Sequence, residues 1–282
     1  MYISIDLGRS TTRIASTLDL KSVLKIVKFK TESDINLQKS NMYKAFDEVT
    51  GSTEVDAISF GFPGITDKFK KVFEKSANYP QIEGLNIKNI FPERFNQSKI
   101  LVENDAALGA LGEAYFGSGK DKESIAYLTL STGVGGAFVK KYENEYILIN
   151  AEPGHQVVNL DDSTFDGTGI KGTLESYCSG SFFKKRYGAA PDVTAGEENW
   201  KKYSYYLSAG IINIVSMWDP EVIVIGGGLS IHNFDNFYKH LINEIKKQNF
   251  FTVPEIRKST LEDDSGIYGG FILLKENLWN FA

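Results

Sequence analysis

The chain has 282 residues, of which 42% are hydrophobic and 24% are charged, which is the composition of a folded globular protein. Its 31 Lys and Arg residues against 36 Asp and Glu residues give a formal net charge of −5, which argues against a surface specialised for nucleic acid. The length predicts two domains, since one domain usually holds roughly 100 to 200 residues.

A single cysteine, Cys178, can form neither an internal disulfide nor a structural zinc cluster, which predicts a reducing compartment. Asp6 and Arg9 interrupt the first ten residues, so no signal peptide is expected. The apolar runs are only strand-sized, whereas a membrane span needs roughly 18 residues. We therefore expect a cytoplasmic protein that does not enter a membrane.

The first expected element is a β-hairpin over residues 2–17, with a turn of Gly, Ser and Thr residues after Asp6. Small turn residues let a ligand approach the backbone, which is typical of a phosphate-binding hairpin. Residues 125–141 repeat this layout, so the sequence indicates a duplicated domain whose two turns hold one polyphosphate. Two ordinary hairpins with glycine-containing turns are the alternative.

A strand over residues 57–60 leads into a tight turn that contains Gly64, and Asn78 precedes a loop that contains proline. Both segments can be plain loops. An asparagine beside a ligand would instead offer a hydrogen-bond donor and an acceptor to a hydroxyl group.

Asp105 stands where a strand over residues 100–102 meets a helix over residues 105–116, a position at which α/β proteins bind ligands. A carboxylate kept ionised by a helix N-terminus can take the proton of a sugar hydroxyl during phosphoryl transfer. Asn104 can pair with neighbouring hydroxyls. The alternatives are an N-cap for Asp105 and a turn residue for Asn104. Asp6 is the carboxylate expected to help place Mg²⁺.

A domain boundary is expected near residues 116–124, where small and charged residues break the apolar periodicity. This predicts a smaller domain over residues 1–116 and a larger one over residues 117–282. The last helix, roughly residues 269–281, is expected to pack back on the first domain.

Glu152, His155 and Glu175 are polar residues among small or apolar neighbours, which suits recognition of hydroxyl groups. A lone histidine is more often structural than a ligand, and Glu175 can simply favour the first turn of a helix. A helix is expected farther along, over residues 203–217.

Three consecutive glycines, Gly226, Gly227 and Gly228, follow a buried strand over residues 222–225 and let a flat ligand lie against the main chain. They do not complete a dinucleotide-binding fingerprint, because its third glycine is absent. A helix is expected over residues 234–248. The repeated order of strand and helix indicates an α/β fold.

The chain resembles the ROK family of sugar kinases nearly from end to end. The ordered segments that carry this resemblance are DLGRSTTR, FGFPGITD, ANYP, LVENDAALGALGEAYFG, LTLSTGVGGAFV, AEPGH, GTLESYCSG and DPEVIVIGGG. The resemblance implies the actin-like ATPase fold, in which two related ribonuclease H-like α/β domains flank an interdomain cleft that closes around ATP and a hexose.

By position, the resemblance places the catalytic base at Asp105. It implies sugar-binding residues at Gly64, Asn78, Asn104, Asp105, Glu152, His155 and Glu175. It implies nucleotide-binding residues at Asp6, Gly8, Ser10 and Thr11, at Thr132, Gly133, Gly135 and Gly136, and at Gly226, Gly227 and Gly228. The implied cofactors are ATP and Mg²⁺, with Asp6 acting on the metal mostly through water and phosphate.

The chain departs from the family pattern at two places. Arg9 replaces the usual second glycine of the first phosphate loop, and its side chain either adds charge near phosphate or points away. Many relatives carry a zinc-binding cysteine motif where this chain has Asp166, Thr168 and Thr173. No zinc site is therefore expected, and the loop over residues 161–173 must be held by ordinary hydrogen bonds.

The leading hypothesis is an ATP-dependent kinase that phosphorylates a hexose hydroxyl. Glucose is the first candidate, while fructose, mannose, allose and N-acetylated hexosamines stay open. A sugar-binding or sugar-sensing protein without kinase activity is the alternative. A repressor with a DNA-binding segment is disfavoured, because Asp6 leaves no room ahead of it for a helix-turn-helix. The resemblance suggests a homodimer.

Overall fold

Two compact units make up the chain: unit 1 consists of Met1–Gly112 and Asp264–Ala282, and unit 2 of Glu113–Asp263. The boundary predicted after residue 116 lies a few residues beyond the observed one, which falls between Gly112 and Glu113.

Among the described residues, no helix has both the length and the apolar character of a membrane span. The computed structural model describes residues 1–67, 69–76, 79–95, 97–143, 145–191, 194–248 and 253–279.

A five-stranded mixed sheet forms the centre of unit 1, in the order β3-β2-β1-β4-β7. β1, β4 and β7 are parallel, while β2 is antiparallel to β1 and to β3. The hairpin predicted over residues 2–17 is therefore confirmed as β1 and β2. A small second sheet pairs β5 (Ile65–Thr66) with β6 (Phe73–Lys75). The strands of the large sheet are β1 (Tyr2–Leu7), β2 (Thr11–Thr17), β3 (Lys25–Lys30), β4 (Ala57–Phe62) and β7 (Lys99–Asn104).

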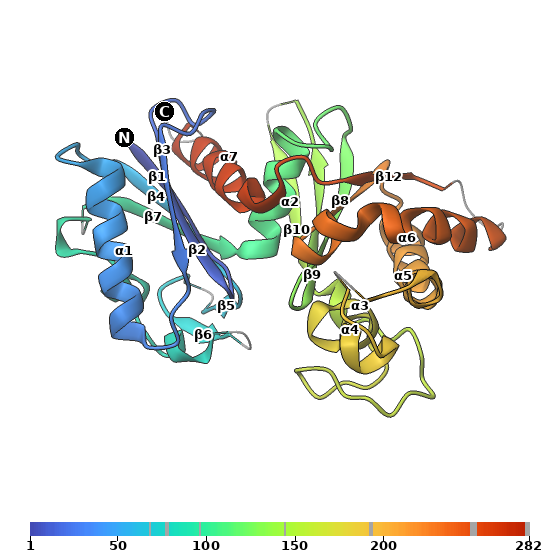
Figure 1. Cartoon of the computed structure of the whole chain (residues 1–282). Coiled ribbons are helices and arrows are strands. Elements are labelled where there is room, and N and C mark those ends of the chain that lie inside the picture. Colours follow the sequence, from blue (N-terminus) through green and yellow to red (C-terminus); the bar gives the residue numbers. More distant parts are fainter. Residues whose placement is uncertain are drawn as a thin grey trace. The chain divides into compact units, whose positions relative to one another are not determined.

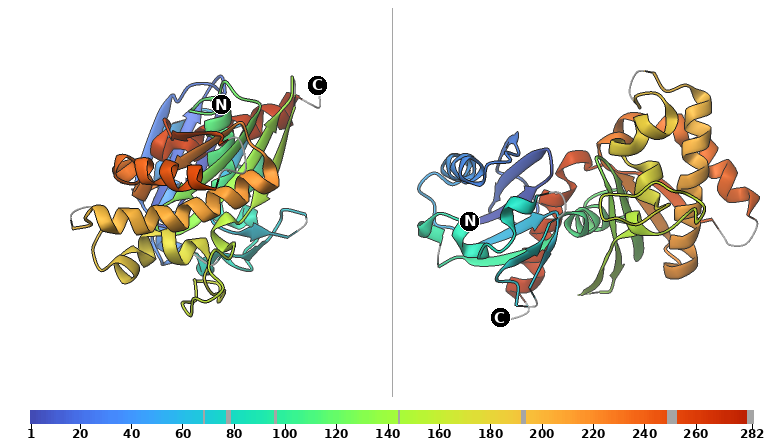
Figure 2. Two further views of the ribbon diagram at one scale, coloured as in Figure 1. Left: turned by 90° about the vertical axis from the view of Figure 1, so that its right-hand side faces the viewer. Right: turned by 90° about the horizontal axis from the view of Figure 1, so that it is seen from below.

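Helices α1 (Ile35–Thr50) and α7 (Ser265–Trp279) cover opposite faces of this sheet (Figures 1 and 2). The alternation of side chains along β1 explains this arrangement. Ile3 and Ile5 pack in one cluster with Phe46 of α1, whereas Ser4 between them faces Gly270 of α7. Further apolar residues of α7 join Ala15 and Ala57 on their face of the sheet, namely Ile267, Phe271 and Leu274.

Unit 2 repeats this design with a five-stranded sheet in the order β10-β9-β8-β11-β12. β8, β11 and β12 are parallel, and β8 forms an antiparallel hairpin with β9, which confirms the second hairpin predicted from sequence. The strands are β8 (Ser124–Leu130), β9 (Val134–Lys141), β10 (Tyr146–Ala151), β11 (Val222–Gly226) and β12 (Glu255–Lys258).

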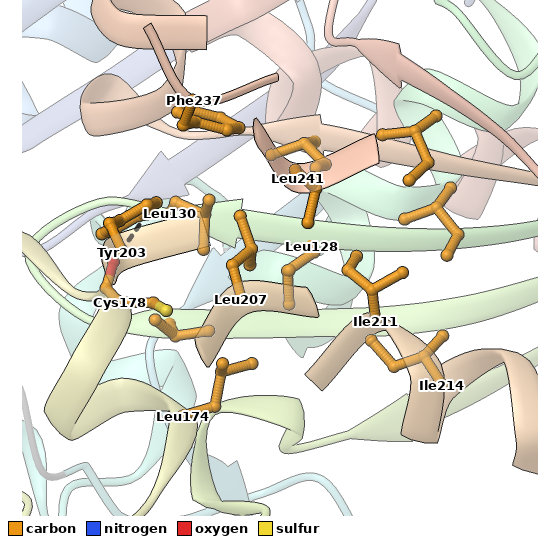
Figure 3. Packing of buried hydrophobic residues seen from close by; sticks show 14 of the residues in the cluster. Leu128, Leu130, Leu174, Cys178, Tyr203, Leu207, Ile211, Ile214, Phe237 and Leu241 are labelled. Atoms are coloured by element: carbon orange, nitrogen blue, oxygen red, sulfur yellow. Dashed lines mark hydrogen bonds between the residues drawn. The ribbon is translucent and has the colours of Figure 1, made fainter. Parts of the chain in front are cut away.

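Helices α5 (Glu197–Trp218) and α6 (Gly228–Lys247) bury the largest apolar cluster of unit 2 against its sheet (Figure 3). Leu128 of β8 lies in this cluster with Leu207 of α5 and Leu241 of α6. Burial of one such side chain contributes about 2 kcal/mol. The cluster also contains residues of α3 (Leu174–Cys178) and α4 (Gly180–Tyr187), among them the Cys178 thiol, whose pKa is raised by burial.

The predicted start of α6 at residue 234 is wrong, because the helix already begins at Gly228. Gly227 has φ of 87°, a left-handed conformation that glycine adopts without strain, and it turns β11 directly into the helix. The helix predicted from residue 203 likewise begins earlier, at Glu197. Acidic residues in its first turn favour a helix N-terminus although they carry no apolar signal.

The remaining helices are short except for α2 (Asp105–Tyr115), which contains the residues where unit 1 passes into unit 2. The 3₁₀ helices are Pro80–Ile82, Ile87–Ile90, Glu93–Phe95, Pro153–His155 and Glu262–Asp264.

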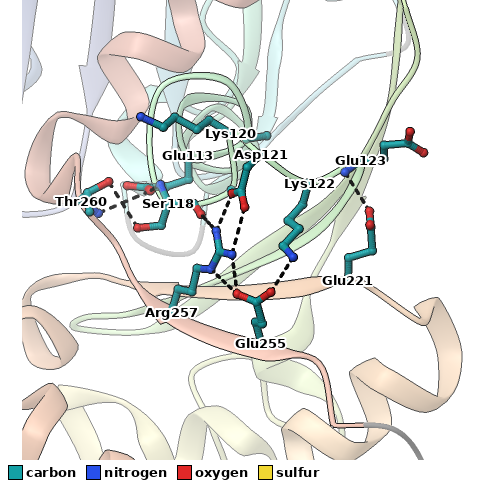
Figure 4. Close-up of polar contacts among 12 residues, drawn as sticks. Glu113, Ser118, Lys120, Asp121, Lys122, Glu123, Glu221, Glu255, Arg257 and Thr260 are labelled. Atoms are coloured by element: carbon teal, nitrogen blue, oxygen red, sulfur yellow. Dashed lines mark hydrogen bonds and ion pairs between the residues drawn. The ribbon is translucent and has the colours of Figure 1, made fainter.

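Glu113 of α2 is fully buried and holds together two segments of unit 2 that lie far apart in sequence (Figure 4). Its Oε2 accepts a hydrogen bond from the Ser118 N–H at 2.8 Å, and its Oε1 accepts from Ser259 Oγ at 2.6 Å and from the Leu261 N–H at 3.0 Å. Arg257 adds an ion pair to Asp121 at 2.5 Å beside this cluster. The chain leaves unit 1 just before Glu113 and returns to it just after Leu261.

Candidate active site

Three parallel strands of unit 1 bring the first group of predicted site residues to one edge of the sheet. Asp6 of β1 pairs in register with Gly61 of β4, and Gly61 pairs with Glu103 of β7. The segments that follow these strands therefore begin side by side. Gly8 and Ser10 lie in the turn that leads to Thr11 of β2, Gly64 follows β4, Asn104 ends β7 and Asp105 begins α2. Asn78 lies outside the described residues.

The N-terminus of α2 separates the roles of Asn104 and Asp105. Asn104 Oδ1 accepts hydrogen bonds from the N–H groups of Ala106 at 2.9 Å and Ala107 at 3.1 Å, which is the behaviour of an N-cap. Asp105 is the first helical residue, and its Oδ1 accepts from the adjacent Ala106 N–H at 2.9 Å. The sequence left open which residue caps the helix, and the structure gives that role to Asn104.

Glu103 is a further carboxylate at this edge, and its charge is balanced locally. Lys70 Nζ lies 3.0 Å from Glu103 Oε2, while Glu103 Oε1 accepts from the Asn104 N–H at 3.0 Å. Glu103 thus supports the backbone just ahead of Asp105, and helix α2 places its positive N-terminal end at the Asp105 carboxylate.

The turn between β1 and β2 is tied to the neighbouring strand. The Gly8 N–H donates to the Thr11 carbonyl at 3.1 Å, and Thr31 Oγ donates to the Gly8 carbonyl at 2.7 Å. Arg9 and Ser10 are exposed in this turn, so the replacement of glycine by arginine is sterically tolerated.

Asp6, the candidate magnesium ligand, is nearly buried and forms an ion pair with Arg13 of β2 at 3.2 Å. A Cβ atom on Gly266 would lie 3.0 Å from Asp6 Cγ, so the carboxylate also lies against the first turn of α7. Arg13 was not expected as a partner of Asp6 from the sequence. The only signal was the presence of a basic residue, Arg13, on the second strand of the hairpin, where it pairs in register with Asp6.

In unit 2, the turn between β8 and β9 carries Thr132 and Gly133. The N–H groups of Gly180 and Ser181, at the start of α4, donate to the carbonyls of Ser131 at 2.7 Å and Thr132 at 3.2 Å. Among the described residues, the N–H groups of Thr132 and Gly133 meet no acceptor. A turn whose carbonyls are engaged and whose N–H groups are available is suited to an anion.

The glycine run lies at the same edge of the sheet as this turn, because Gly226 at the end of β11 pairs in register with Thr129 of β8. A Cβ atom on Gly227 would come within 2.5 Å of the Leu130 carbonyl oxygen, whereas one on Gly228 would meet nothing within 4 Å. Open space therefore borders the first turn of α6, whose N-terminal end favours an anion. Gly135 and Gly136 lie within β9 rather than in the turn.

Glu152, His155 and Glu175 lie close to one another in unit 2. The His155 N–H donates to the Glu152 carbonyl at 3.0 Å, and Glu175 Oε2 accepts from the Val134 N–H at 3.0 Å, which joins Glu175 to the end of the β8–β9 turn. Glu152 is exposed, but the protein atoms around its carboxyl group displace enough water to raise its pKa. His155 opposes this rise, and the negative charge of Glu175 adds to it.

Hydrogen bonds to Asp166 organise the loop over residues 161–173. Its Oδ1 accepts from Thr168 Oγ and from the N–H groups of Thr168 and Ile170 at 2.8 to 3.0 Å, and its Oδ2 lies 2.9 Å from His155 Nδ1. Burial acts to raise the pKa of Asp166, but hydrogen bonds from His155, Ile170 and Thr168 outweigh it and lower the pKa to about 2.

Thr173 caps the short helix α3, since its Oγ accepts from the Ser176 N–H at 3.3 Å. Within the described ranges, no three His, Cys, Asp or Glu side chains form a group that could hold a metal ion. The expectation of a chain without zinc stays a prediction.

Comparisons with known proteins extend over both units. A family model described as the ROK family matches residues 2–277. A glucokinase from Thermotoga maritima is 25% identical in an alignment that covers 98% of this chain and 98% of that protein. An N-acetyl-D-glucosamine kinase from Vibrio parahaemolyticus is 29% identical in an alignment that covers 77% of this chain and 80% of that protein.

A crystal structure of a ROK family glucokinase from Streptomyces griseus, in complex with glucose and AMPPNP, matches the fold with a TM-score of 0.79 at 21% identity. The match covers 96% of this chain and 98% of that one. Together with the two mixed sheets, this likeness confirms the predicted α/β fold of the actin-like ATPase type.

Proposed function

Because the chain belongs to the ROK family, we propose that it transfers the terminal phosphoryl group of ATP to a hydroxyl group of a hexose, with Asp105 as the general base. The observation that carries this proposal is that Asn104 and Asp105 have different roles at the start of α2. Asn104 caps the helix, whereas Asp105 is its first residue, so the carboxylate of Asp105 lies at the positive N-terminal end of α2 without serving as its cap.

Two features of unit 2 support nucleotide binding. The turn at Thr132 and Gly133 presents backbone N–H groups to the phosphates, and the open space beside Gly228 admits the adenosine against the main chain. The glucokinase from Streptomyces griseus was crystallised with an ATP analogue, which supports the same donor here.

The candidate sugar contacts fall into two groups, each described within its own unit. Asn104 and Asp105 belong to unit 1, while Glu152, His155 and Glu175 lie together in unit 2 beside the phosphate turn. Gly64 keeps the turn after β4 close to β6, and Asn78 is assigned by resemblance alone. Glucose is the first candidate substrate. The similarity to an N-acetyl-D-glucosamine kinase makes N-acetylated hexosamines further candidates.

In this mechanism Asp105 removes the proton from the attacking hydroxyl as the phosphoryl group arrives in line. The positive N-terminal end of α2 favours the ionised form of a carboxylate at this position. Glu103 is paired with Lys70, so it adds little negative charge beside Asp105.

Asp6 fits a magnesium site of the usual kind, in which one carboxylate acts with waters and phosphate oxygens. It stands at the strand edge just before the first turn, and the ion pair with Arg13 fixes its position. The chemistry that Mg²⁺ supplies when bound is neutralisation of phosphate charge.

An ATP-coupled assay tests the proposal, with glucose, fructose, mannose, allose and N-acetylglucosamine as acceptors, with and without Mg²⁺ and with a zinc-selective chelator. Turnover should need Mg²⁺ and survive the zinc chelator. Asp105→Asn should lower kcat by about 10² to 10⁴ fold, because the base acts in the transition state, while the sugar Kd stays within about tenfold.

Asn104→Ala is the matched control for this variant. It removes the cap and should lower the free energy of unfolding by about 1 kcal/mol, whereas Asp105→Asn should leave it within about 0.5 kcal/mol of the original value. If Asp105→Asn destabilises the chain as the cap variant does, or abolishes sugar binding, Asp105 is structural. Sugar binding without any turnover in the unaltered chain would favour the sugar-sensing alternative.

A further inference from the structure

His155 and Asp166 form a pair whose geometry determines which ring nitrogen of the histidine carries a proton. His155 Nδ1 lies 2.9 Å from Asp166 Oδ2, and the Asp166 side chain is fully buried while that of His155 is 25% exposed. A carboxylate that has lost its proton can only accept a hydrogen bond, so Nδ1 must be the donor. In a neutral ring, Nε2 is then left as an acceptor.

Asp166 cannot easily turn away from this arrangement, because its other oxygen is also engaged. Oδ1 accepts hydrogen bonds from the Thr168 N–H, from Thr168 Oγ and from the Ile170 N–H. These donors fix the plane of the carboxylate and aim Oδ2 at the histidine.

His155 Nε2 has no hydrogen-bond partner in the described part of the chain, and the ring keeps access to solvent. The neighbouring carboxylates are those of Glu152 and Glu175, which the proposed function assigns to sugar hydroxyls. The carboxylates of Glu152 and Glu175 accept hydrogen bonds. When His155 Nε2 is also an acceptor, all three side chains can accept hydrogen bonds from hydroxyl groups.

Resting on the proposed sugar-kinase function, we propose that Asp166 is a positioning residue that holds His155 in the Nδ1–H tautomer, so that Nε2 accepts a hydrogen bond from a sugar hydroxyl. Asp166 itself does not touch the substrate. Its effect on sugar binding passes through the ring of His155, and the loop over residues 161–173 supplies the donors that keep it in place.

The substitution Asp166→Asn exchanges donor and acceptor in the hydrogen bond to His155 Nδ1, while it keeps the hydrogen bonds that the loop donates to Oδ1. The three loop donors require an oxygen at the Oδ1 position, so the amide nitrogen must take the Oδ2 position and face His155 Nδ1. Nδ1 then becomes an acceptor, and the neutral ring changes to the Nε2–H tautomer. A sugar hydroxyl that donated to Nε2 would now meet a donor.

Long-range ¹H–¹⁵N correlation spectra of the full chain without sugar report the tautomer directly, and the signals of His155 are assigned by their loss in His155→Gln. We expect the Nδ1–H tautomer in the unaltered chain and the Nε2–H tautomer in Asp166→Asn. Thr168→Val is the matched control, because it removes one donor to Oδ1 and leaves the contact at Oδ2, and it should keep the Nδ1–H tautomer.

The same variants are compared in sugar binding by calorimetry and in the coupled assay. Asp166→Asn should weaken sugar binding about tenfold and raise KM to match, with kcat within about twofold, whereas Thr168→Val should change neither by more than about twofold. A tautomer that is Nε2–H in the unaltered chain, or unchanged by Asp166→Asn, overturns the inference. So does a reversed tautomer with unchanged sugar affinity.

Failure of the proposed function gives a different pattern. If the unaltered chain binds a sugar but never phosphorylates it, phosphoryl transfer is refuted, and the affinities and tautomers still decide the role of Asp166. If no sugar in the panel binds, both proposals are wrong. The tautomer of the unaltered chain is read without Asp166→Asn, so the inference can be refuted even if that variant does not fold.

Discussion

Replacement of Glu113 by glutamine tests whether its buried carboxylate is needed to hold together two distant segments of unit 2. Both oxygens accept hydrogen bonds, Oε2 from the N–H groups of Ser118 and, at 3.5 Å, Thr260, and Oε1 from Ser259 Oγ and the Leu261 N–H. An amide has only one oxygen. If that oxygen stays toward Ser259 and Leu261, the amide nitrogen faces the N–H groups of Ser118 and Thr260, and these partly buried donors lose their acceptor.

One unsatisfied buried donor costs about 1 to 3 kcal/mol, and the remaining hydrogen bonds lose their charge assistance, so Glu113→Gln should destabilise unit 2 by about 2 to 3 kcal/mol. At a typical urea dependence of about 2 kcal/mol per molar, the unfolding midpoint should fall by about 1 M. Urea titration followed by far-UV circular dichroism and tryptophan fluorescence measures this shift, because Trp200 and Trp218 both lie in α5 of unit 2.

Glu123→Gln is the matched control. The Glu123 side chain is 76% exposed and pairs only loosely with Lys140 at 3.4 Å, so its replacement should change the free energy of unfolding by less than about 0.5 kcal/mol. The reasoning is refuted if Glu113→Gln unfolds at the same urea concentration as the unaltered chain or as this control.

Two further predictions concern the turn after β4 and the acid stability of the loop over residues 161–173. Gly64→Ala should raise the sugar KM at least about tenfold, because a Cβ atom there would lie 2.2 Å from the Lys75 carbonyl oxygen and the backbone must shift; an unchanged KM would remove Gly64 from the site. Burial acts to raise the pKa of Asp162, but hydrogen bonds from Arg186 and Thr164 lower it to about 2. Because the pKa is lower in the folded chain, ionised Asp162 stabilises the fold at pH values above its ordinary pKa of 3.8. That contribution of about 2 kcal/mol disappears as the pH falls toward 2. Denaturant titrations from about pH 5 down to 2 should therefore show a steeper loss of stability in the unaltered chain than in Asp162→Asn, and parallel curves would contradict the assignment.

The local features of the fold could be predicted from the sequence, because their signals lie within a few residues. Small residues between two β-rich runs indicated both hairpins, and the change from an apolar run to Asn104 and Asp105 indicated the strand-to-helix junction. The start of α6 was missed because a glycine run resembles a loop. Only the φ value of Gly227 shows that the helix follows the strand directly.

The long-range contacts of the fold and of the candidate site could not be predicted, because their partners are distant in sequence or chemically ambiguous. Glu113 and Ser259 are 146 positions apart, and nothing in either local sequence points to the other. Asp166 was noticed only as a substitute for a cysteine. Its hydrogen bond to His155 depends on how the intervening loop folds back, which periodicity does not report.

The position of α7 has a consequence for the order in which the protein folds during synthesis. Unit 2 is one uninterrupted stretch of chain, so it can fold as soon as residues 113–263 have left the ribosome. The sheet of unit 1 is translated first, yet the face occupied by Ile267 and Phe271 stays uncovered until α7 emerges. The nascent chain must therefore keep an exposed apolar surface through the translation of the whole of unit 2, and a chaperone that binds such surfaces would act during that interval.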